Sequence, residues 1–373
     1  MSKKISSNKH DARRTVVVSA VNLVEGGTLS ILRDCLATLR GELPPHWRIV
    51  ALVHDRALAP AEGVEYLEFP DIKASWLRRA WFEYWSCRRL SRTLGADLWL
   101  ALHDLTPVVQ ARRQVVYCHN PMPFYRITWR ESWMAPKQLV FTLFYGFMYR
   151  LFIRRNHAII VQQDWLRDEF RRRYGVREVI VSRPVPPAGV ATAREPSDAP
   201  LFIYPTLPRI FKNLEIVGEA VRILEADKRW RGRVKLTISG QENAYAREIH
   251  GRFADLRTLE FIGLQTREEM KSLYAQADCL LFPSRLETWG LPLTEAQGHG
   301  LPILAANLPY ARETVGGYPR VAYFEPRDAA MLAQQMLALQ ERRLAFEPAP
   351  PPRIAEPYAP DWPSLARLLV TNL

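Results

Sequence analysis

Cysteine is scarce in this sequence, and the few cysteines form no recognisable motif. The 373 residues include four, scattered and without a C-x-x-C pair: Cys35, Cys87, Cys118 and Cys279. This spacing argues against a structural zinc site and a disulfide scaffold, and it is typical of a reducing cytosol. Residues 1–14 are basic and polar and lack the apolar core of a signal peptide. We therefore expect a cytoplasmic protein.

Long apolar runs are also missing. The longest, residues 139–153, covers 15 positions and contains Arg150. A transmembrane helix needs about 20 consecutive apolar residues, so this run is too short to cross a bilayer. It fits either a buried helix or a shallow interfacial helix at which a lipid-borne substrate docks.

Positive charge, by contrast, is plentiful and lies in one half of the chain. The net charge is +12, and residues 1–190 hold 29 basic against 17 acidic side chains, so they carry the whole excess. A basic surface concentrates anionic partners near it. The first half of the chain is therefore expected to face such a partner.

Arginine and aromatic residues interleave between positions 76 and 92. This segment fits an amphipathic helix whose aromatics line the core, a contact with an anionic membrane surface, or a nucleic-acid-binding helix. The sequence has no helix-turn-helix, RNP or zinc-finger pattern, so we do not expect nucleic acid as a partner. The residues concerned are Trp76, Arg78, Arg79, Trp81, Phe82, Tyr84, Trp85, Arg88, Arg89 and Arg92.

Short apolar runs predict alternating strands and helices. In the first half, strands are expected at 15–20, 49–53, 97–101, 115–118 and 158–161, with Thr28 as the N-cap of a helix after the first. Beyond the proline-rich stretch 183–200 the pattern restarts, with strands at 201–204, 234–239, 259–262 and 279–282, and helices from Asn213, over 266–277 and from Pro292. Such alternation predicts parallel sheets covered by helices on both faces.

The predicted organisation is two doubly wound, Rossmann-like α/β domains that face each other across a cleft. The first covers residues 1–186 and the second residues 201–346, joined by a linker at 187–200. Residues 347–373 begin with a second proline-rich stretch, and we expect this C-terminal segment to cross back to the first domain.

Three strand-end loops carry residues suited to ligand binding, and ligands of open α/β sheets sit at the carboxyl ends of strands. Gly26 and Gly27 allow close backbone approach at a helix start that presents N–H groups to an anion, although paired glycines also form simple turns. Arg209 and Lys212 flank a second helix start with Asn213 as its expected cap. They suit a diphosphate, unless they are merely solvated loop cations.

The third loop is the most specific. Pro292 fits the first turn of a helix, which places Glu287 in the preceding loop and Glu295 in the opening turns. The free amides around Gly290 and Leu291 lie between the two carboxylates. This pattern matches a sugar–diphosphate–ribose ligand. The helix dipole alone would account for Glu295 but leaves Glu287 unexplained.

These motifs resemble those of family 4 retaining glycosyltransferases of GT-B architecture, the glycosyl transferases group 1, which include O-antigen and other polysaccharide enzymes. Residues 287–295, followed by Gly300-Leu301-Pro302-Ile303, are similar to the E-x7-E region of that family. The remaining matches follow in the family's order: Gly26-Gly27, Arg209 with Lys212-Asn213, Ser239-Gly240, Phe261-Ile262-Gly263 and Pro309-Tyr310-Ala311-Arg312-Glu313. Arg209 and Lys212 are three positions apart where the family has five, and Trp289 replaces the usual phenylalanine.

The resemblance implies transfer of a sugar from a nucleoside diphosphate sugar with retention of configuration and without a metal or other cofactor. Glu287 would hold hydroxyls of the donor sugar and Glu295 the ribose, while Arg209 and Lys212 would stabilise the departing diphosphate. His119 resembles the first-domain histidine near the reacting centre, although a lone histidine can also be structural, and His103-Asp104 is similarly placed. The remaining donor-binding residues would be Gly26, Gly27, Gly240, Gly263, Leu264, Gly290 and Leu291.

The expected partners follow from the same resemblance. The donor would be UDP- or GDP-linked and would bind the second domain, while the first domain would bind a saccharide or lipid-linked saccharide acceptor. The product would be a surface polysaccharide such as O-antigen, made at the inner face of the cytoplasmic membrane. The alternative is a non-catalytic GT-B-like subunit, or a nucleic-acid- or anion-binding protein that uses the arginine-rich half.

Overall fold

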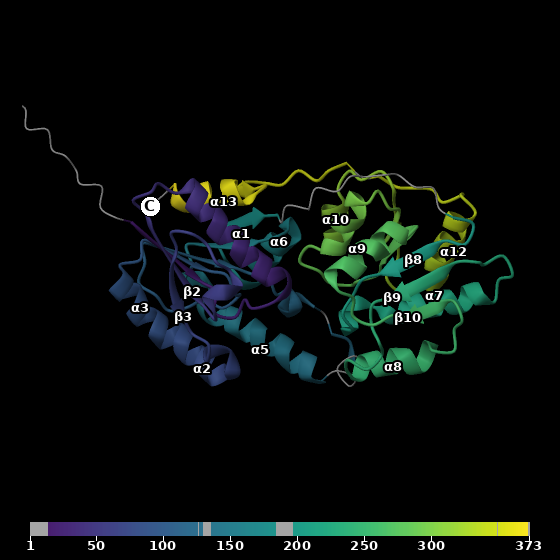
Figure 1. Ribbon diagram of the computed structural model, residues 1–373, viewed down its shortest axis with the longest axis horizontal. Coiled ribbons are helices and arrows are strands. Elements are labelled where there is room, and N and C mark those ends of the chain that lie inside the picture. Colours follow the sequence, from purple (N-terminus) through teal and green to yellow (C-terminus); the bar gives the residue numbers. More distant parts are fainter. Residues whose placement is uncertain (1–13, 126, 130–135, 184–196, 349, 372–373) are drawn as a thin grey trace, which may run out of the picture.

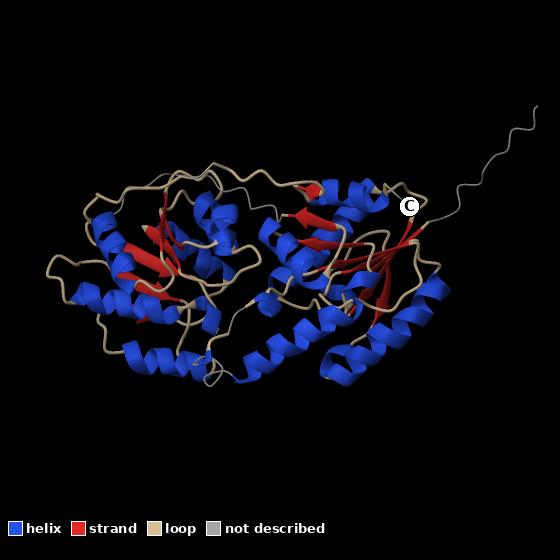
Figure 2. Ribbon diagram, turned by 180° about the vertical axis from the view of Figure 1, so that it is seen from behind, coloured by secondary structure: helices blue, strands red, loops and turns tan. Residues whose placement is uncertain are grey.

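The chain folds into two α/β domains that lie side by side (Figure 1). The computed structural model describes residues 14–125, 127–129, 136–183, 197–348 and 350–371, so most of the predicted linker lies outside the described residues. One sheet has eight strands and the other six, and every strand pairing is parallel. Helices cover both faces of each sheet (Figure 2), as expected for parallel sheets.

The first sheet has the order β14-β7-β6-β5-β4-β1-β2-β3. All five strands expected in this half are present, with ends shifted by at most two residues. Three strands were not predicted: β7, and the edge strands β3, which is partly exposed, and β14, which has only two residues. The strands are β1 (Thr15–Ser19), β2 (Arg48–Val53), β3 (Glu65–Glu68), β4 (Leu98–Ala101), β5 (Arg113–Tyr117), β6 (Ala158–Val161), β7 (Val179–Ser182) and β14 (Tyr358–Ala359).

Several helices of the first domain start directly after a polar residue, such as Glu25, Ser75 or Gln163. The helix after β1 starts at Gly26, with Glu25 in the N-cap position. The prediction that Thr28 caps it was therefore wrong: Thr28 lies in the first turn, and its hydroxyl donates to the Glu25 carbonyl at 3.0 Å. The helices are α1 (Gly26–Glu42), α2 (Trp76–Trp81), a π-helical turn (Phe82–Ser86), α3 (Cys87–Leu94), α5 (Pro136–Phe152) and α6 (Asp164–Tyr174).

The second sheet has the order β10-β9-β8-β11-β12-β13. The predicted strands at 234–239 and 259–262 end earlier than expected, and the others match. In both sheets the strand order reverses beside the first strand of the domain, between β1 and β4 and between β8 and β11, which is where such folds bind ligands. The strands are β8 (Leu201–Tyr204), β9 (Arg233–Leu236), β10 (Leu259–Phe261), β11 (Cys279–Phe282), β12 (Ile303–Ala306) and β13 (Val321–Phe324).

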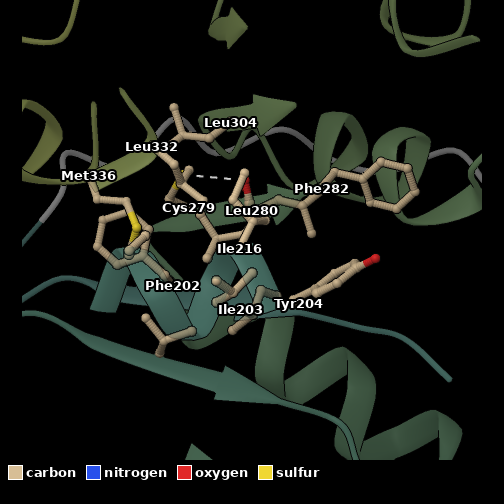
Figure 3. Packing of buried hydrophobic residues seen from close by; sticks show 14 of the residues in the cluster. Phe202, Ile203, Tyr204, Ile216, Cys279, Leu280, Phe282, Leu304, Leu332 and Met336 are labelled. Carbon is tan, nitrogen blue, oxygen red and sulfur yellow. Dashed lines mark hydrogen bonds between the residues drawn. The ribbon is translucent and has the colours of Figure 1, made fainter. Parts of the chain in front are cut away.

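The core of the second domain is built from these strands and the helices packed on them. Figure 3 shows Phe202, Leu280 and Leu304 of neighbouring strands against Ile216 and Met336 of two helices, all nearly or fully buried. The helices are α7 (Leu214–Glu225), α8 (Ala244–Phe253), α9 (Arg267–Gln276), α10 (Leu291–Gly298), α11 (Pro309–Val315) and α12 (Ala329–Gln340).

The C-terminal segment returns to the first domain. Its strand β14 pairs with β7, and α13 (Trp362–Val370) lies beside α1 (Figure 1). Leu365 and Leu369 are buried in the same cluster as Leu36, and Arg367 bonds to Glu42 at 2.9 Å. This return ties the two domains together at a second place besides the linker.

The two domains also touch directly. Met122, Phe211 and Leu286 form a small buried cluster from loops of both domains. The Gln163 amide donates to the Thr314 hydroxyl at 2.6 Å. These contacts bring the carboxyl ends of strands β5, β8 and β11 to one interface, so the two sheets present the same kind of edge to each other.

Candidate active site

Most of the predicted donor-binding residues lie at the carboxyl edge of the second sheet. Lys212 follows β8, Gly240 follows β9, Gly263 follows β10 and Glu287 follows β11. Because these strands are parallel, their following loops share one edge. Gly27 and His119 follow β1 and β5 at the corresponding edge of the first sheet.

Lys212 and Glu287 form an ion pair. The Lys212 ammonium lies 2.5 Å from Glu287 Oε1, and only 15% and 14% of the two side chains are exposed. The backbone of Lys212 is fixed by the Tyr204 hydroxyl, which donates to its carbonyl at 2.9 Å. Burial, and then the Glu287 charge, raise the pKa of Tyr204, so it stays a neutral donor. The cation and the carboxylate are thus held together in the loops that follow β8 and β11.

Glu295 is held separately, on α10. The Tyr274 hydroxyl donates to Glu295 Oε2 at 2.6 Å, and the Tyr274 ring stacks on His299 at 5.2 Å. Burial, followed by the Glu295 charge, raises the pKa of Tyr274, which keeps this donor protonated. Tyr274 was not among the predicted residues, because its position in the last turn of α9 carries no local signal for a contact with α10.

The start of α10 has the predicted form, with Pro292 in its first turn. Gly290 adopts a φ of 84°, and a Cβ there would lie 3.1 Å from the Phe282 ring, so glycine is required at this position. The next residue, Leu291, reaches the first domain, since a Cβ built on Gly27 would lie 3.7 Å from Leu291 Cδ1. That is ordinary contact distance, and a methyl group would fit at Gly27. The steric argument for glycine therefore holds at Gly290 and not at Gly27.

The cap predicted for α7 is confirmed in its position but not in its side-chain hydrogen bond. Asn213 occupies the N-cap position, but its φ of 58° is left-handed and its side chain makes no cap hydrogen bond. Its amide instead donates to the carbonyls of Pro283 and Pro326 at 3.2 and 2.9 Å. Asn213 thus connects the loops that follow β8, β11 and β13, and it supports the backbone next to Lys212.

The remaining donor-site predictions fall on positions that differ in exposure. Arg209 is exposed and forms no ion pair with any described residue. Leu264 is 76% exposed, next to Gly263 with its φ of 72°. Gly240 has a φ of 86°, and a Cβ there would come within 2.6 Å of His250. Their roles toward a donor stay predictions.

His119 lies on a loop fixed by Asp104. Asp104 Oδ1 accepts from the backbone N–H groups of His119 and Asn120 at 2.6 and 2.8 Å and from the Tyr149 hydroxyl at 3.1 Å. The buried ring nitrogens of His119 make no hydrogen bond of ordinary geometry with a described residue. Burial lowers the pKa of His119 despite the opposing charge of Asp104, so the imidazole is neutral.

His103 has a different environment from its neighbour Asp104. Its Nε2 lies 3.1 Å from the Ser19 hydroxyl and 3.3 Å from Glu83 Oε1, and the side chain is almost fully buried. Burial lowers the pKa of His103 to about 3 and raises the pKa of Glu83 to about 8, so both groups are uncharged at neutral pH. This arrangement indicates that His103 supports the interior of the first domain, while Asp104 positions the His119 loop.

A cavity of about 660 Å³ lies between the domains. Its walls combine aromatic residues, such as Phe124 and Trp165 from the first domain and Tyr310 from the second, with charged residues such as Arg173 and Glu325. Lys212, Glu287 and Glu295 are not among its lining residues, so this cavity is distinct from the predicted donor site.

Two doubly wound parallel domains with facing carboxyl edges define the GT-B architecture, and solved structures show the same fold. Sucrose-phosphate synthase from Thermosynechococcus elongatus matches with a TM-score of 0.60 and 14% identity over 89% of this chain and 90% of that one. Anabaena Alr3699/HepE in complex with UDP and glucose matches with a TM-score of 0.54 and 14% identity over 96% and 97% of the two chains.

The second domain resembles a known family. Residues 192–347 match the model of the family "Glycosyl transferases group 1". The O-antigen chain mannosyltransferase RfbU of Salmonella typhimurium is 21% identical over 241 residues, which is 63% of each chain. Further curated relatives, among them the O-antigen chain mannosyltransferase B of Escherichia coli, are matched over only 30% to 36% of their lengths.

Proposed function

We propose that this protein is a retaining glycosyltransferase that moves a sugar from a nucleoside diphosphate sugar to a saccharide acceptor. The observation that carries the proposal is the Lys212–Glu287 pair, held at 2.5 Å where the strand order of the second sheet reverses. A cation beside a carboxylate at this place suits a ligand that has a diphosphate and a sugar next to each other.

The proposed chemistry assigns different tasks to the two charges. When the bond between the anomeric carbon and the diphosphate breaks, negative charge grows on the departing phosphate, and the Lys212 ammonium stabilises it. Arg209 adds a second cation from the loop before it. Glu287 accepts hydrogen bonds from hydroxyls of the donor sugar. The backbone N–H groups of Gly290 and Leu291 at the start of α10 supply further donors to the phosphate, so the proposed mechanism uses no metal ion.

The other residues position the two ends of the reaction. Glu295 accepts from the ribose hydroxyls, in an orientation fixed by Tyr274. Gly240, Gly263 and Leu264 border the base of the donor.

The first domain binds the acceptor in this proposal, close to His119. The buried, neutral imidazole can accept a hydrogen bond from a substrate hydroxyl. Gly26 and Gly27 bring the start of α1 to the donor from the same side. The acceptor's proton passes to the departing phosphate in the mechanism usually drawn for this family.

The biological role is proposed from relatives. Two of the curated relatives are O-antigen chain mannosyltransferases, which supports a saccharide acceptor on a lipid carrier in surface polysaccharide synthesis. The structure of Alr3699/HepE with UDP and glucose supports a UDP-linked donor, with GDP as the other candidate base. In this role the protein acts in the cytoplasm, at the inner face of the membrane.

A nucleotide-sugar panel tests the proposal. The protein is incubated with UDP- and GDP-linked sugars and release of free nucleotide is measured, while thermal shift with UDP, GDP and a short oligonucleotide reports binding. One nucleotide should raise the melting temperature, and Lys212→Ala should abolish that shift. Lys271→Ala, which breaks an exposed pair with Glu268, is the matched control. Stabilisation by the oligonucleotide alone, without nucleotide release, would favour the non-catalytic, nucleic-acid-binding alternative.

A further inference from the structure

Helix α5 has apolar residues on two sides, of which one is buried and the other is exposed. Tyr145, Tyr149 and Ile153 are buried against the domain. The opposite side carries large apolar residues at helical spacing, and each is 38% to 65% exposed: Val140, Leu143, Phe144, Phe147 and Leu151. A surface helix normally directs polar residues toward water, so this stripe indicates a surface that meets something other than water.

Helix α2 and the π-helical turn extend the same surface. Trp81 and Trp85 are each 61% exposed and stack on each other at 5.0 Å with nearly parallel rings. Leu77 is 84% exposed, and the half-exposed Trp76 packs edge-on against Phe144 of α5 at 5.0 Å. Figures 1 and 2 both show α2 and α5 along one edge of the first domain. The aromatic face is defined here by these residues: Trp76, Leu77, Trp81, Trp85, Val140, Leu143, Phe144, Phe147 and Leu151.

This finding decides between the interpretations of residues 76–92. The interpretation that the aromatic residues line the core holds for Phe82, which is buried, and is wrong for Trp76, Trp81 and Trp85. The extra residue per turn of the π-helical turn shifts only the side chains within and after it around the helix axis, so it bears on Trp85 and not on Trp76 or Trp81.

The charges around the aromatic face are almost all positive. Residues 76–94 contain five arginines and a single acidic residue, Glu83, and residues 139–155 contain three arginines and no acidic residue. Glu83 is fully buried and so contributes no negative charge to the surface. Within the described part of the chain, the exposed Arg78, Arg88 and Arg89 have no acidic partner. Arginines of the second domain such as Arg229 are, by contrast, paired.

We infer that the aromatic face docks on an anionic lipid bilayer. Tryptophan favours the headgroup layer, exposed aliphatic side chains favour the acyl boundary, and arginine binds lipid phosphates. A second copy of the chain is a poorer occupant, because two such faces would bring positive charge against positive charge. Single-stranded nucleic acid would use the arginines and aromatic rings but not Leu77, Val140, Leu143 and Leu151. No helix among the described residues is long and apolar enough to cross a bilayer.

The docking surface is connected to the proposed acceptor site by α5 itself. Tyr149, on its buried side, donates to Asp104, which in turn holds the backbone of His119. An acceptor anchored in the membrane would therefore reach His119 from the docked side of the domain. This consequence rests on the proposed function, whereas docking itself does not.

Vesicle flotation tests the docking without any donor. Vesicles of phosphatidylcholine are compared with vesicles of equal parts phosphatidylcholine and phosphatidylglycerol, at low and high salt. The full chain should float with the anionic vesicles only, and salt should weaken binding. The double variant Leu143→Ser/Phe147→Ser should lose at least about tenfold in affinity. Ile223→Ser, at a 47% exposed site on α7, should change nothing.

A second pair of variants tests the charge. Arg78→Gln/Arg88→Gln should weaken binding to anionic vesicles at low salt, and Arg257→Gln in the second domain is the matched control. Nucleotide-induced thermal shift of every variant should equal that of the parent, which shows that it is folded. If the parent floats with anionic vesicles but no nucleotide raises its melting temperature, the proposal of donor binding is overturned and the docking inference is not.

Three outcomes would overturn the docking inference. They are equal binding to neutral and anionic vesicles, no binding to either, and a stable dimer in sedimentation that Leu143→Ser/Phe147→Ser dissociates while vesicles remain unbound. A fourth outcome would also reject a bilayer as the occupant: the protein binds no vesicles, but it binds an oligonucleotide tightly and in a salt-sensitive way through the same arginines.

Discussion

Lys212 and Glu287 are 75 residues apart in the sequence, yet their side chains meet at 2.5 Å. They follow β8 and β11, which are hydrogen-bonded neighbours in the second sheet. The pairing of these two strands therefore places the cation and the carboxylate together, and it does so at the strand pair where the order of the sheet reverses.

Removing either member of this pair should slow sugar transfer. We expect Lys212→Ala and Glu287→Ala each to reduce the rate at least tenfold, which corresponds to about 1.4 kcal/mol of transition-state stabilisation. Each variant leaves a mostly buried charge without its partner, so urea unfolding should be measured beside nucleotide release. Turnover equal to the parent in a folded variant would remove that residue from the proposed mechanism, and Glu268→Ala serves as an exposed control.

Tyr274→Phe should weaken donor binding while leaving the fold intact. The substitution keeps the ring that stacks on His299 and removes only the hydroxyl that donates to Glu295. If Glu295 holds the ribose, KM for the donor should rise severalfold with little change in kcat, because the carboxylate loses its fixed orientation. An unchanged KM would show that this hydrogen bond does not serve donor binding.

Asp104→Ala should destabilise the first domain. The substitution leaves two backbone N–H groups and the Tyr149 hydroxyl without their acceptor, and each such loss costs about 1–3 kcal/mol when the donor is buried. Alanine also tolerates the φ of 57° poorly. Asp104→Asn, which keeps an acceptor oxygen and accommodates this φ, should restore most of the lost free energy of unfolding. Equal losses in both variants would show that the charge, and not the acceptor, is required.

Glu83→Gln should change how stability depends on pH. Burial raises the pKa of Glu83 from 4.5 to about 8, so the folded chain keeps a proton that the unfolded chain releases as pH rises through this range. The free energy of unfolding therefore falls between about pH 4.5 and 8. Glutamine cannot ionise, so the stability of the variant relative to the parent should increase over this window and then stay constant.

Urea denaturation at several pH values measures this difference. The groups that face Glu83 are present in both proteins: Arg79, His103 and Cys87. The pKa of His103, lowered by burial to about 3, makes both proteins less stable as pH falls below 6.5. A difference between variant and parent that does not vary from pH 5 to 8 would show that Glu83 is ionised in the folded chain.

The sequence predicted five of the eight strands of the first domain, because each of the five is a short, almost fully buried run of mostly apolar residues. It also predicted the start of α10, since Pro292 can occupy only the first turn without losing a hydrogen bond. It was wrong about the cap of α1 and about the side-chain hydrogen bond of the α7 cap, where capping depends on backbone torsion as well as residue type. Asn213 has a left-handed backbone that directs its amide toward other loops, and the backbone at Glu25 starts α1 before Thr28.

For the candidate site, too, the sequence determined some features and the tertiary structure decided the others. By itself the sequence determined which loops carry charge and glycine, because strand periodicity and helix-start chemistry are local properties. Only the tertiary structure decided that Lys212 pairs with Glu287, that Tyr274 holds Glu295 and that Asp104 anchors His119. It also decided that three tryptophans face outward. Such contacts depend on strand order and on how helices rotate against the sheets, and these follow from the packing of the whole chain rather than from any segment of it.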